Sequence, residues 1–258
     1  MTVLAAPRLL PLEGGLNLRD LGGYAAKDGR RIKSAMLFRS GAMSMLTEAD
    51  ERHLASLGIA TVCDFRRRNE READPTRWCE PAGVHYWARD YSSSTGILGE
   101  IFRADMITAD QVRDAMIALY RREILVDHAP SYQYMFERLL GGHIPLLFNC
   151  SAGKDRTGVA AALILTVLDV PYQTILEDYL DTNKYFDLRR LFRAGRSENR
   201  LLETCDAETL APLAAADADY LAAMFESLDR DHGGIDRYLA ALGVDAAAKE
   251  RLQGLLLE

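Results

Sequence analysis

The sequence is poor in cysteine, in positive charge and in long apolar runs. Its formal charge of -7 disfavours nucleic acid or an anionic membrane as the principal partner, because both are bound through an excess of Lys and Arg. It has four cysteines, Cys63, Cys79, Cys150 and Cys205. They are widely spaced, show no paired metal-ligand spacing and are too sparse for a disulfide framework in 258 residues. This favours a reducing compartment.

The opening of the chain does not resemble an export signal. MTVLAAPRLLPLEGG has no basic residue before its short apolar stretch and carries an early Pro7. No uninterrupted apolar run reaches the roughly 20 residues that span a bilayer. With 48% hydrophobic and 27% charged residues, the composition is that of a globular protein. We expect a cytoplasmic protein with a single domain over residues 1–258 and no stable membrane association.

Short apolar runs alternate with helical patterns, which is typical of an α/β fold. The runs at 59–65 (IATVCDF), 84–87 (VHYW) and 144–148 (IPLLF) predict strands, and the first and last have the composition of strands buried on both faces.

Helices are predicted between these strands. Thr47 is expected to cap a helix that stops at Gly58, and residues 157–168 form a pattern that is apolar around its whole circumference, so this helix should be buried. From 109 to 140 the apolar residues recur at helical spacing, and Pro130 predicts a division into two helices.

The stretch FNCSAGKDRTG, residues 148–158, stands where an apolar run ends and a helical pattern begins. Unpaired N–H groups at a helix N-terminus form a natural anion site. Residues 151–156 can curl around a tetrahedral phosphate, with Gly153 permitting the tight path, and Arg156 can donate to two phosphate oxygens. Cys150 lies in the same field and is expected to be a nucleophile.

This stretch has two other interpretations. The nucleotide-binding pattern G-x-x-x-x-G-K-[ST] fails, because its first glycine would be Phe148 and the residue after Lys154 is Asp155 instead of a hydroxyl. Cys150 as a small buried residue at a strand end is the simpler alternative. The strand, the glycine, the acid beside the arginine and the helix start together favour the phosphate-binding loop.

The loop resembles the signature of the cysteine-dependent phosphatases, and its GKDRTG form is similar to that of the bacterial atypical tyrosine and dual-specificity phosphatases. Five further segments resemble this family in the same order: NLRDLGGY (17–24), LFRSG (37–41), LGIATVCDFR (57–66), DYLDTN (178–183) and GGIDRYLAALGV (233–244). The resemblance implies a cysteine-phosphatase-like α/β fold with a central, mainly parallel sheet flanked by helices. It also implies helical insertions, and segments within 100–127 and 186–230 are candidates for a lid.

The resemblance further implies a metal-independent hydrolase that acts on phosphotyrosine, with phosphoserine, phosphothreonine and phosphoinositides as further substrates. Cys150 would form a cysteinyl-phosphate, and no metal or cofactor is expected because Arg156 and the loop amides carry the charge. The partner would be a phosphorylated protein or a small phosphoester. The oligomeric state stays open.

The general acid of this family is the aspartate inside the loop, here Asp155, although the same residue could simply interact with the helix dipole. Asp90 is the rival acid and Asp127 a weaker one. The residues expected to bind the substrate phosphate are Ser151, Ala152, Gly153, Lys154 and Arg156.

Asp64, Thr157 and Asn149 are expected to support the site. Lys154 either meets a second phosphate or pairs with Asp64, which the resemblance places nearby. Thr157 is expected to cap the helix, and its hydroxyl could also stabilise the departing thiolate of Cys150. Asn17, Arg19 and Asp20 are expected to hold the loop and the sheet together by hydrogen bonds.

Asn149 stands where the family carries a histidine. An asparagine amide can donate to a carbonyl but cannot carry a positive charge, so we expect activity to persist with its pH optimum moved upward. One alternative is a catalytically weak, phosphate-binding pseudophosphatase. The other is a redox-sensing thiol protein in which Cys63 resolves an oxidised Cys150.

Overall fold

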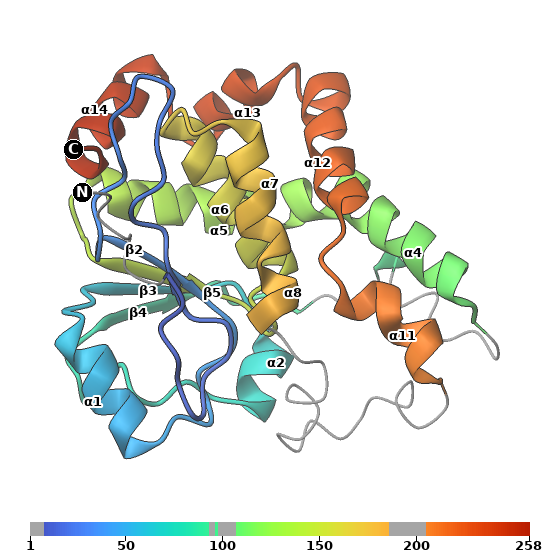
Figure 1. Ribbon diagram of the computed structural model, residues 1–258, viewed down its shortest axis with the longest axis horizontal. Coiled ribbons are helices and arrows are strands. Elements are labelled where there is room, and N and C mark those ends of the chain that lie inside the picture. The colour runs from blue at the N-terminus through green and yellow to red at the C-terminus, as the bar shows by residue number, and fades with distance from the viewer. Residues whose placement is uncertain (1–7, 93–95, 98–106, 186–204) are drawn as a thin grey trace, which may run out of the picture.

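The computed structural model describes residues 8–92, 96–97, 107–185 and 205–258. The described residues form a five-stranded sheet in the order β1-β2-β5-β3-β4, in which β1 is antiparallel to β2 and the other pairings are parallel (Figure 1). This is the mainly parallel sheet that the sequence predicted. The strands are β1 Arg19–Asp20, β2 Leu37–Ser40, β3 Thr61–Asp64, β4 His85–Ala88 and β5 Leu146–Asn149.

Helices lie on both faces of the sheet, with α5 and α6 on one side and α1 and α2 on the other (Figure 1). A second group of helices, α4, α11 and α12, lies beside the sheet at the right of the same view. The helices are α1 Glu48–Ser56, α2 Arg68–Ala73, α4 Ala109–Ala118, the π-helix η1 Leu119–Glu123, α5 Ile124–Leu140, α6 Asp155–Val167, α7 Tyr172–Leu180, α8 Thr182–Tyr185, α11 Ala207–Ala214, α12 Ala218–Asp231, α13 Ile235–Ala241 and α14 Ala246–Leu256.

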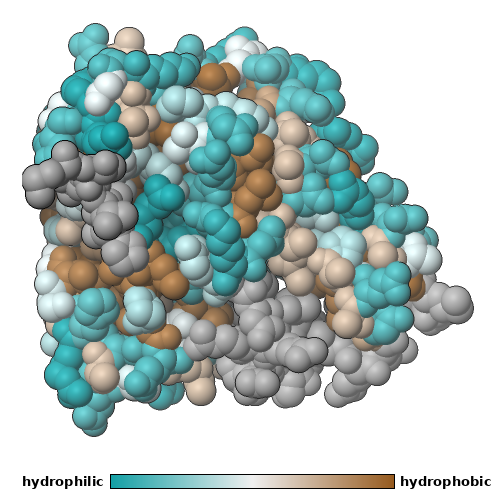
Figure 2. All heavy atoms as spheres, viewed as in Figure 1, coloured by the Kyte–Doolittle hydropathy of each residue, from teal (hydrophilic) through white to brown (hydrophobic). Residues whose placement is uncertain are grey.

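Successive side chains of the strands pack on opposite faces of the sheet, as the period of a strand requires. Phe38, Val62 and Leu147 form one cluster with Leu54 of α1 and with Trp78. Their neighbours in the same strands belong to a larger cluster with α5 and α6, to which these strand residues contribute: Leu37, Cys63, Leu146 and Phe148. The outer faces of α12 and α14 carry mostly hydrophilic side chains (Figure 2).

Most of the predicted elements are present. Thr47 caps α1 through a capping box with Asp50, and the helix ends before Gly58. The strands lie within or one residue beyond the predicted runs. Residues 159–165 of α6 are all buried, as an apolar circumference requires. Within the described ranges, no helix has both the length and the apolar character needed to cross a membrane.

The division predicted at Pro130 is wrong. The helix α5 continues through Pro130, and the irregular turn lies upstream, at the π-helix η1. A proline in a helix deprives the carbonyl four residues earlier, here that of Val126, of its hydrogen bond. Pro130 and Val126 are both exposed, so water can satisfy that carbonyl and the helix tolerates the proline.

A buried ion network ties the first two strands to α7. Arg39 of β2 donates to the carboxylate of Asp178 in α7, and Arg19 of β1 lies 3.9 Å from the same carboxylate. Tyr24 donates its hydroxyl proton to this carboxylate at 3.0 Å. Burial raises the pKa of Asp178, but Arg39 and Arg19 lower it by more, so that it lies below its ordinary value. The carboxylate is therefore charged at neutral pH and compensates two buried cations.

We expect Asp178→Ala to lower the free energy of unfolding by about 3–5 kcal/mol, because it leaves two buried guanidinium groups without their anion. Urea denaturation followed by circular dichroism measures this loss. The control is Asp231→Ala, which removes an exposed partner of Arg230 and should change the unfolding midpoint little. Equal midpoints for the two variants would contradict a stabilising role of the buried network.

Candidate active site

The loop between β5 and α6 places Cys150 at the carboxyl end of the sheet. Cys150 follows β5 directly and is only 1% exposed. Gly153 has φ +69°, and a Cβ at this position would lie 2.6 Å from the backbone of Ser40 and Gly41. Both the left-handed backbone and the close approach require glycine. The loop therefore makes its turn pressed against the end of β2.

Two carbonyl groups of the loop point outward into the protein. The carbonyl of Ser151 accepts the backbone N–H of Ala42 at 3.0 Å. The carbonyl of Gly153 accepts Nη2 of Arg39 at 2.8 Å and Nδ2 of Asn17 at 3.3 Å. Because the C=O and N–H of a trans peptide point in opposite directions, the following N–H groups face the inside of the loop. Together with the first turn of α6 they form an anion site.

Arg156, in the first turn of α6, is held by Glu70 of α2. Its Nη1 and Nη2 donate to the two carboxylate oxygens of Glu70 at 2.7 Å each, and Nη1 also donates to the carbonyl of Phe65 at 3.1 Å. The hydroxyl of Ser151 donates to the same carboxylate. Glu70 therefore fixes the plane of the guanidinium next to the loop.

The ion pair between Glu70 and Arg156 shifts the pKa of both side chains. Burial raises the pKa of Glu70, but Arg156 and the hydrogen bonds from Ser151 and the backbone of Arg67 together lower it by more, so that it lies well below its ordinary value. Burial lowers the pKa of Arg156, but Glu70 raises it well above its ordinary value. Both groups are therefore charged at neutral pH. A guanidinium has a second two-pronged edge at Nε, through which Arg156 can bind a phosphate while Glu70 holds its other edge.

Asp155 is the first residue of α6, and its side chain is 25% exposed. Its Oδ1 accepts the hydroxyl proton of Tyr120 at 2.8 Å and lies 3.4 Å from Nζ of Lys154. The hydroxyl of Tyr120 also bonds that of Tyr179 at 2.8 Å. One oxygen of the candidate acid is thus held by hydrogen-bond donors, while the side chain as a whole keeps access to solvent.

Lys154 is placed differently from both expectations. It is 1% exposed, and its ammonium donates to the carbonyls of Leu213 at 2.5 Å and Ala215 at 3.1 Å. The last carbonyls of a helix lack intrahelical partners, so the end of α11 offers a buried cation the acceptors it needs. In this arrangement Lys154 contacts Asp155 instead of Asp64, and its ammonium is not available to a second phosphate.

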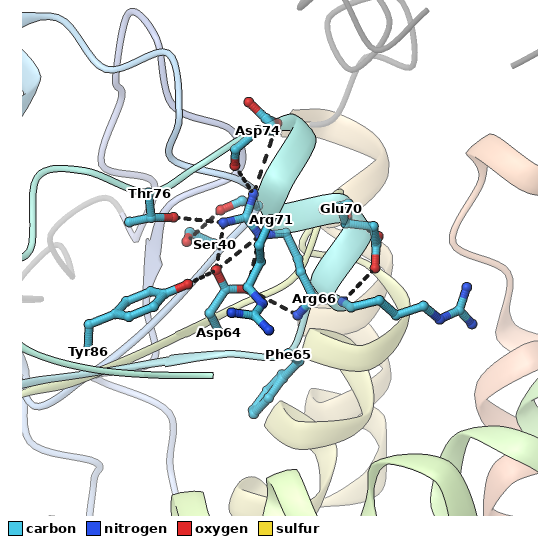
Figure 3. A network of polar contacts seen from close by, with 12 residues as sticks. Ser40, Asp64, Phe65, Arg66, Glu70, Arg71, Asp74, Thr76 and Tyr86 are labelled. Carbon is cyan, nitrogen blue, oxygen red and sulfur yellow. Dashed lines mark hydrogen bonds and ion pairs between the residues drawn. The ribbon is translucent and has the colours of Figure 1, made fainter. Parts of the chain in front are cut away.

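Asp64, at the end of β3, pairs with Arg66. Nε of Arg66 donates to its Oδ1 at 2.9 Å and Nη2 donates to Oδ2 at 2.6 Å. Tyr86 donates to Oδ2 at 2.8 Å, and Arg66 also bonds Thr76 at 2.7 Å. These side chains converge on the strand end, whereas Glu70 points away from them (Figure 3). Asp64 therefore belongs to a structural cluster next to the loop.

The two rival acids are held elsewhere. Asp90 is exposed and forms a two-pronged ion pair with Arg68 of α2. The hydrogen bonds from Arg68 hold the pKa of Asp90 below its ordinary value, which disfavours the protonated form that a general acid needs. Asp127 is exposed on α5. The geometry favours Asp155, which shares the first helical turn with Arg156.

Asn149 and Thr157, which stand at the two ends of the loop sequence, are buried polar residues. Thr157 does not cap α6, because the N-cap residue is Lys154 and no side chain caps the helix. The Oγ1 of Thr157 has no hydrogen-bond partner among the described residues. Asn149 is 2% exposed, stands in register with Ser40 and Asp64, and its Nδ2 has no partner in the same ranges. An unpaired buried donor is costly, so both groups are candidates to bond the thiolate or a ligand.

Cys63 gives little support to the redox interpretation. It stands in register with Phe148, and burial raises the pKa of its thiol to about 12. A thiol that keeps its proton is a poor partner for an oxidised cysteine. Over the ranges that the structure describes, no three His, Cys, Asp or Glu side chains are grouped to hold a metal ion.

Glu70 and Tyr120 are site residues that the sequence did not predict. The segment 66–77 is highly charged, which favours a solvated loop or short helix, but it follows the carboxyl end of a buried parallel strand, where ligand sites of α/β proteins gather. That position is the available signal for Glu70. Tyr120 lies in an apolar pattern at helical spacing, and nothing in that spacing distinguishes it from a core residue. The insertions predicted within 100–127 and 186–230 fall partly at 100–106 and 186–204, outside the described residues.

A protein-family model described as "Tyrosine phosphatase family" matches residues 10–258. A Cupriavidus necator protein provisionally named a tyrosine-protein phosphatase is 34% identical over 239 residues, which cover 90% of this chain and 83% of that protein. The triple specificity protein phosphatase PtpB of Mycobacterium tuberculosis is 29% identical over 95% of this chain and 98% of its own length.

Solved structures with some similarity include TpbA of Pseudomonas aeruginosa in complex with pTyr, with 18% identity over 71% of this chain and 90% of that chain, and a TM-score of 0.35. The catalytic domain of the PP-IP phosphatase SIW14 of Saccharomyces cerevisiae has 14% identity over 80% and 93% of the two chains, and a TM-score of 0.34.

We expect Glu70→Ala to lower kcat/KM for a small aryl phosphate at least about 10-fold, because a guanidinium displaced by an ångström costs up to about 100-fold in rate. The matched control is Glu72→Ala, which removes an exposed acid from the same helix and should leave kcat/KM unchanged. Unchanged or higher activity in Glu70→Ala would mean that the carboxylate competes with the substrate phosphate instead of orienting Arg156.

Proposed function

Because this chain belongs to the tyrosine phosphatase family, we propose that it hydrolyses phosphotyrosine through a covalent phosphate on Cys150. The observation that carries the proposal is the loop between β5 and α6. There Cys150 and Arg156 stand on either side of amides that face inward, and Glu70 holds Arg156 in place. This arrangement supplies a nucleophile, an anion site and an oriented cation within one turn of chain.

In the first step the thiolate of Cys150 attacks phosphorus, and the bond from phosphorus to the ester oxygen breaks. The loop amides and Arg156 stabilise the charge on the equatorial oxygens, and Asp155 gives a proton to the leaving oxygen. In the second step Asp155 takes a proton from water as the water attacks phosphorus, and the thiolate of Cys150 departs. The unpaired hydroxyl of Thr157 is suited to donate a hydrogen bond to that sulfur.

Phosphotyrosine is favoured as the substrate over multiply phosphorylated lipids. Lys154, the residue expected to meet a second phosphate, is buried against the carbonyls of Leu213 and Ala215. The relative named a triple specificity protein phosphatase supports phosphoserine and phosphothreonine as further substrates of this chain. A second phosphate of a phosphoinositide would contact Lys154 only if the lysine left its carbonyl partners.

The proposed function also implies a cellular compartment, a class of substrates and a domain organisation. We place the enzyme in the cytoplasm, where its cysteines would stay reduced. Its substrates would be phosphorylated proteins or small phosphoesters, and residues 1–258 would act as one phosphatase domain. The helices α4, α11 and α12 lie beside the sheet as the candidate lid (Figure 1).

The proposed function is tested by hydrolysis of a small aryl phosphate in the presence of a chelator, with the wild type and Cys150→Ser side by side. We expect turnover by the wild type and none by the variant, because serine is a far weaker nucleophile than a thiolate. Undiminished turnover by Cys150→Ser would rule out the cysteine mechanism. Absence of turnover by folded, reduced wild type would favour the pseudophosphatase alternative.

The effect of Asn149 is tested by Asn149→His. An imidazolium would add positive charge beside Cys150 and favour its thiolate, so we expect the acidic limb of the pH–rate profile to move to lower pH. The variant Asn149→Gln keeps the amide chemistry and serves as the control, with its acidic limb unmoved. Coincident profiles for wild type and Asn149→His would show that this position does not influence the nucleophile.

A further inference from the structure

The helix that precedes α5 widens into the π-helix η1 just where Tyr120 points into the protein. Such turns are rare and often lie at functional sites. Tyr120 is fully buried, and its hydroxyl reaches across to Asp155 of α6, 35 residues further along the chain. Packing alone does not require this bond, because a phenylalanine would fill the same space.

A second tyrosine directs the hydroxyl of Tyr120 toward Asp155. The two hydroxyls of Tyr120 and Tyr179 lie 2.8 Å apart. Because the one proton of Tyr120 is donated to Asp155, the proton between the tyrosines comes from Tyr179. Burial, followed by the charge of Asp155, raises the pKa of both tyrosines well above the ordinary value, so both stay protonated donors.

The position of Tyr179 is fixed by the loop motif. Its ring lies against Gly158, the last residue of that motif, where a Cβ would meet Cδ2 of the ring at 2.9 Å. The ring of Tyr179 also stacks edge-on against that of Tyr120, with centroids 6.2 Å apart. The hydroxyl chain is thus held by α7 and by α6 itself.

The donors all act on one oxygen of the acid. Oδ1 of Asp155 accepts from Tyr120 and lies 3.4 Å from the ammonium of Lys154. An oxygen that accepts a hydrogen bond and lies beside an ammonium is the less favoured site for the proton of a carboxylic acid. In the protonated form of Asp155 the proton therefore sits on Oδ2.

We propose that Tyr120 is a positioning residue for the general acid, which it orients so that Oδ2 of Asp155 delivers the proton to the leaving group. The inference rests on the proposed function. As the S–P bond of Cys150 forms and the P–O bond breaks, the ester oxygen takes the bonding pair and then the proton from Oδ2. The carboxylate left behind is stabilised at Oδ1 by Tyr120 and Lys154. In the second step Oδ2 takes a proton from the attacking water while the S–P bond breaks.

The test measures kcat/KM of Tyr120→Phe for aryl phosphates whose leaving groups range from 4-nitrophenol to unsubstituted phenol. This parameter reports the first step, in which the proton is given. The departure of a poor leaving group such as phenol depends on protonation by the general acid, whereas that of a good one such as 4-nitrophenol does not. We expect Tyr120→Phe to lower kcat/KM about 10-fold for phenyl phosphate and less than about twofold for 4-nitrophenyl phosphate, a fraction of the full effect of a general acid.

Tyr238→Phe is the control, since it removes another buried hydroxyl that donates to a backbone carbonyl, that of Leu125, and should lower no rate selectively. Asp155→Asn should give the same leaving-group dependence as Tyr120→Phe but more strongly, and the double variant should lose no more than Asp155→Asn alone. Tyr179→Phe should show a weaker form of the same pattern.

The outcomes separate the inference from the proposed function. A steep dependence for Asp155→Asn with a uniform or absent loss for Tyr120→Phe would overturn the role of Tyr120 alone. A flat response of Asp155→Asn would overturn the acid assignment and the inference with it, while turnover that still requires Cys150 would leave the cysteine mechanism standing. Additive losses in the double variant would also refute positioning, because they would show that Tyr120 acts independently of Asp155.

Discussion

The geometry of the active-site loop depends on one buried guanidinium, that of Arg39. It donates to the carbonyl of Gly153 and to the carboxylate of Asp178, so it links the loop to α7 through the interior of the protein. The carbonyl it holds faces outward, and the amide that follows must then face inward. Asp178 also neutralises Arg19 of β1. The same buried carboxylate therefore connects β1, β2 and, through Arg39, the loop to α7. The backbone of the anion site is thus held in place by side chains that do not contact the anion.

Three cations near the loop have an internal partner among the described residues. Glu70 takes one edge of Arg156, the end of α11 takes Lys154, and Asp64 takes Arg66. The positive charge that attracts a phosphate is therefore concentrated on one guanidinium edge and on the loop amides. Such an arrangement discriminates by shape as much as by charge, because a misplaced anion finds Lys154 and Arg66 already bonded. It also accounts for a phosphate site in a protein whose net charge is -7.

The sequence predicted the elements whose pattern is local. Patterns among neighbouring residues predict the cap at Thr47, the buried strands, the apolar helix α6 and the glycine turn at Gly153. Partnerships across the chain left no such record: Glu70 and Arg156 are 86 positions apart, and Lys154 meets a carbonyl 59 positions away. The side chains of Lys154 and Thr157 lie elsewhere than expected, because a helix start offers several roles to the same residue and only packing selects among them. Pro130 misled because exposure, which decides its cost, is a property of the folded chain.

The contact between Gly158 and the ring of Tyr179 couples two positions that a sequence comparison would treat as independent. A methyl group at 158 would push the ring aside and carry the phenol hydroxyl with it, while a smaller residue at 179 would make room for that methyl group but abolish the hydroxyl. Variation at the two sites should therefore be correlated, with each substitution tolerated only in the background of the other. The last glycine of the motif is constrained by the helix that packs on it, and this constraint would persist even in a descendant that no longer bound phosphate.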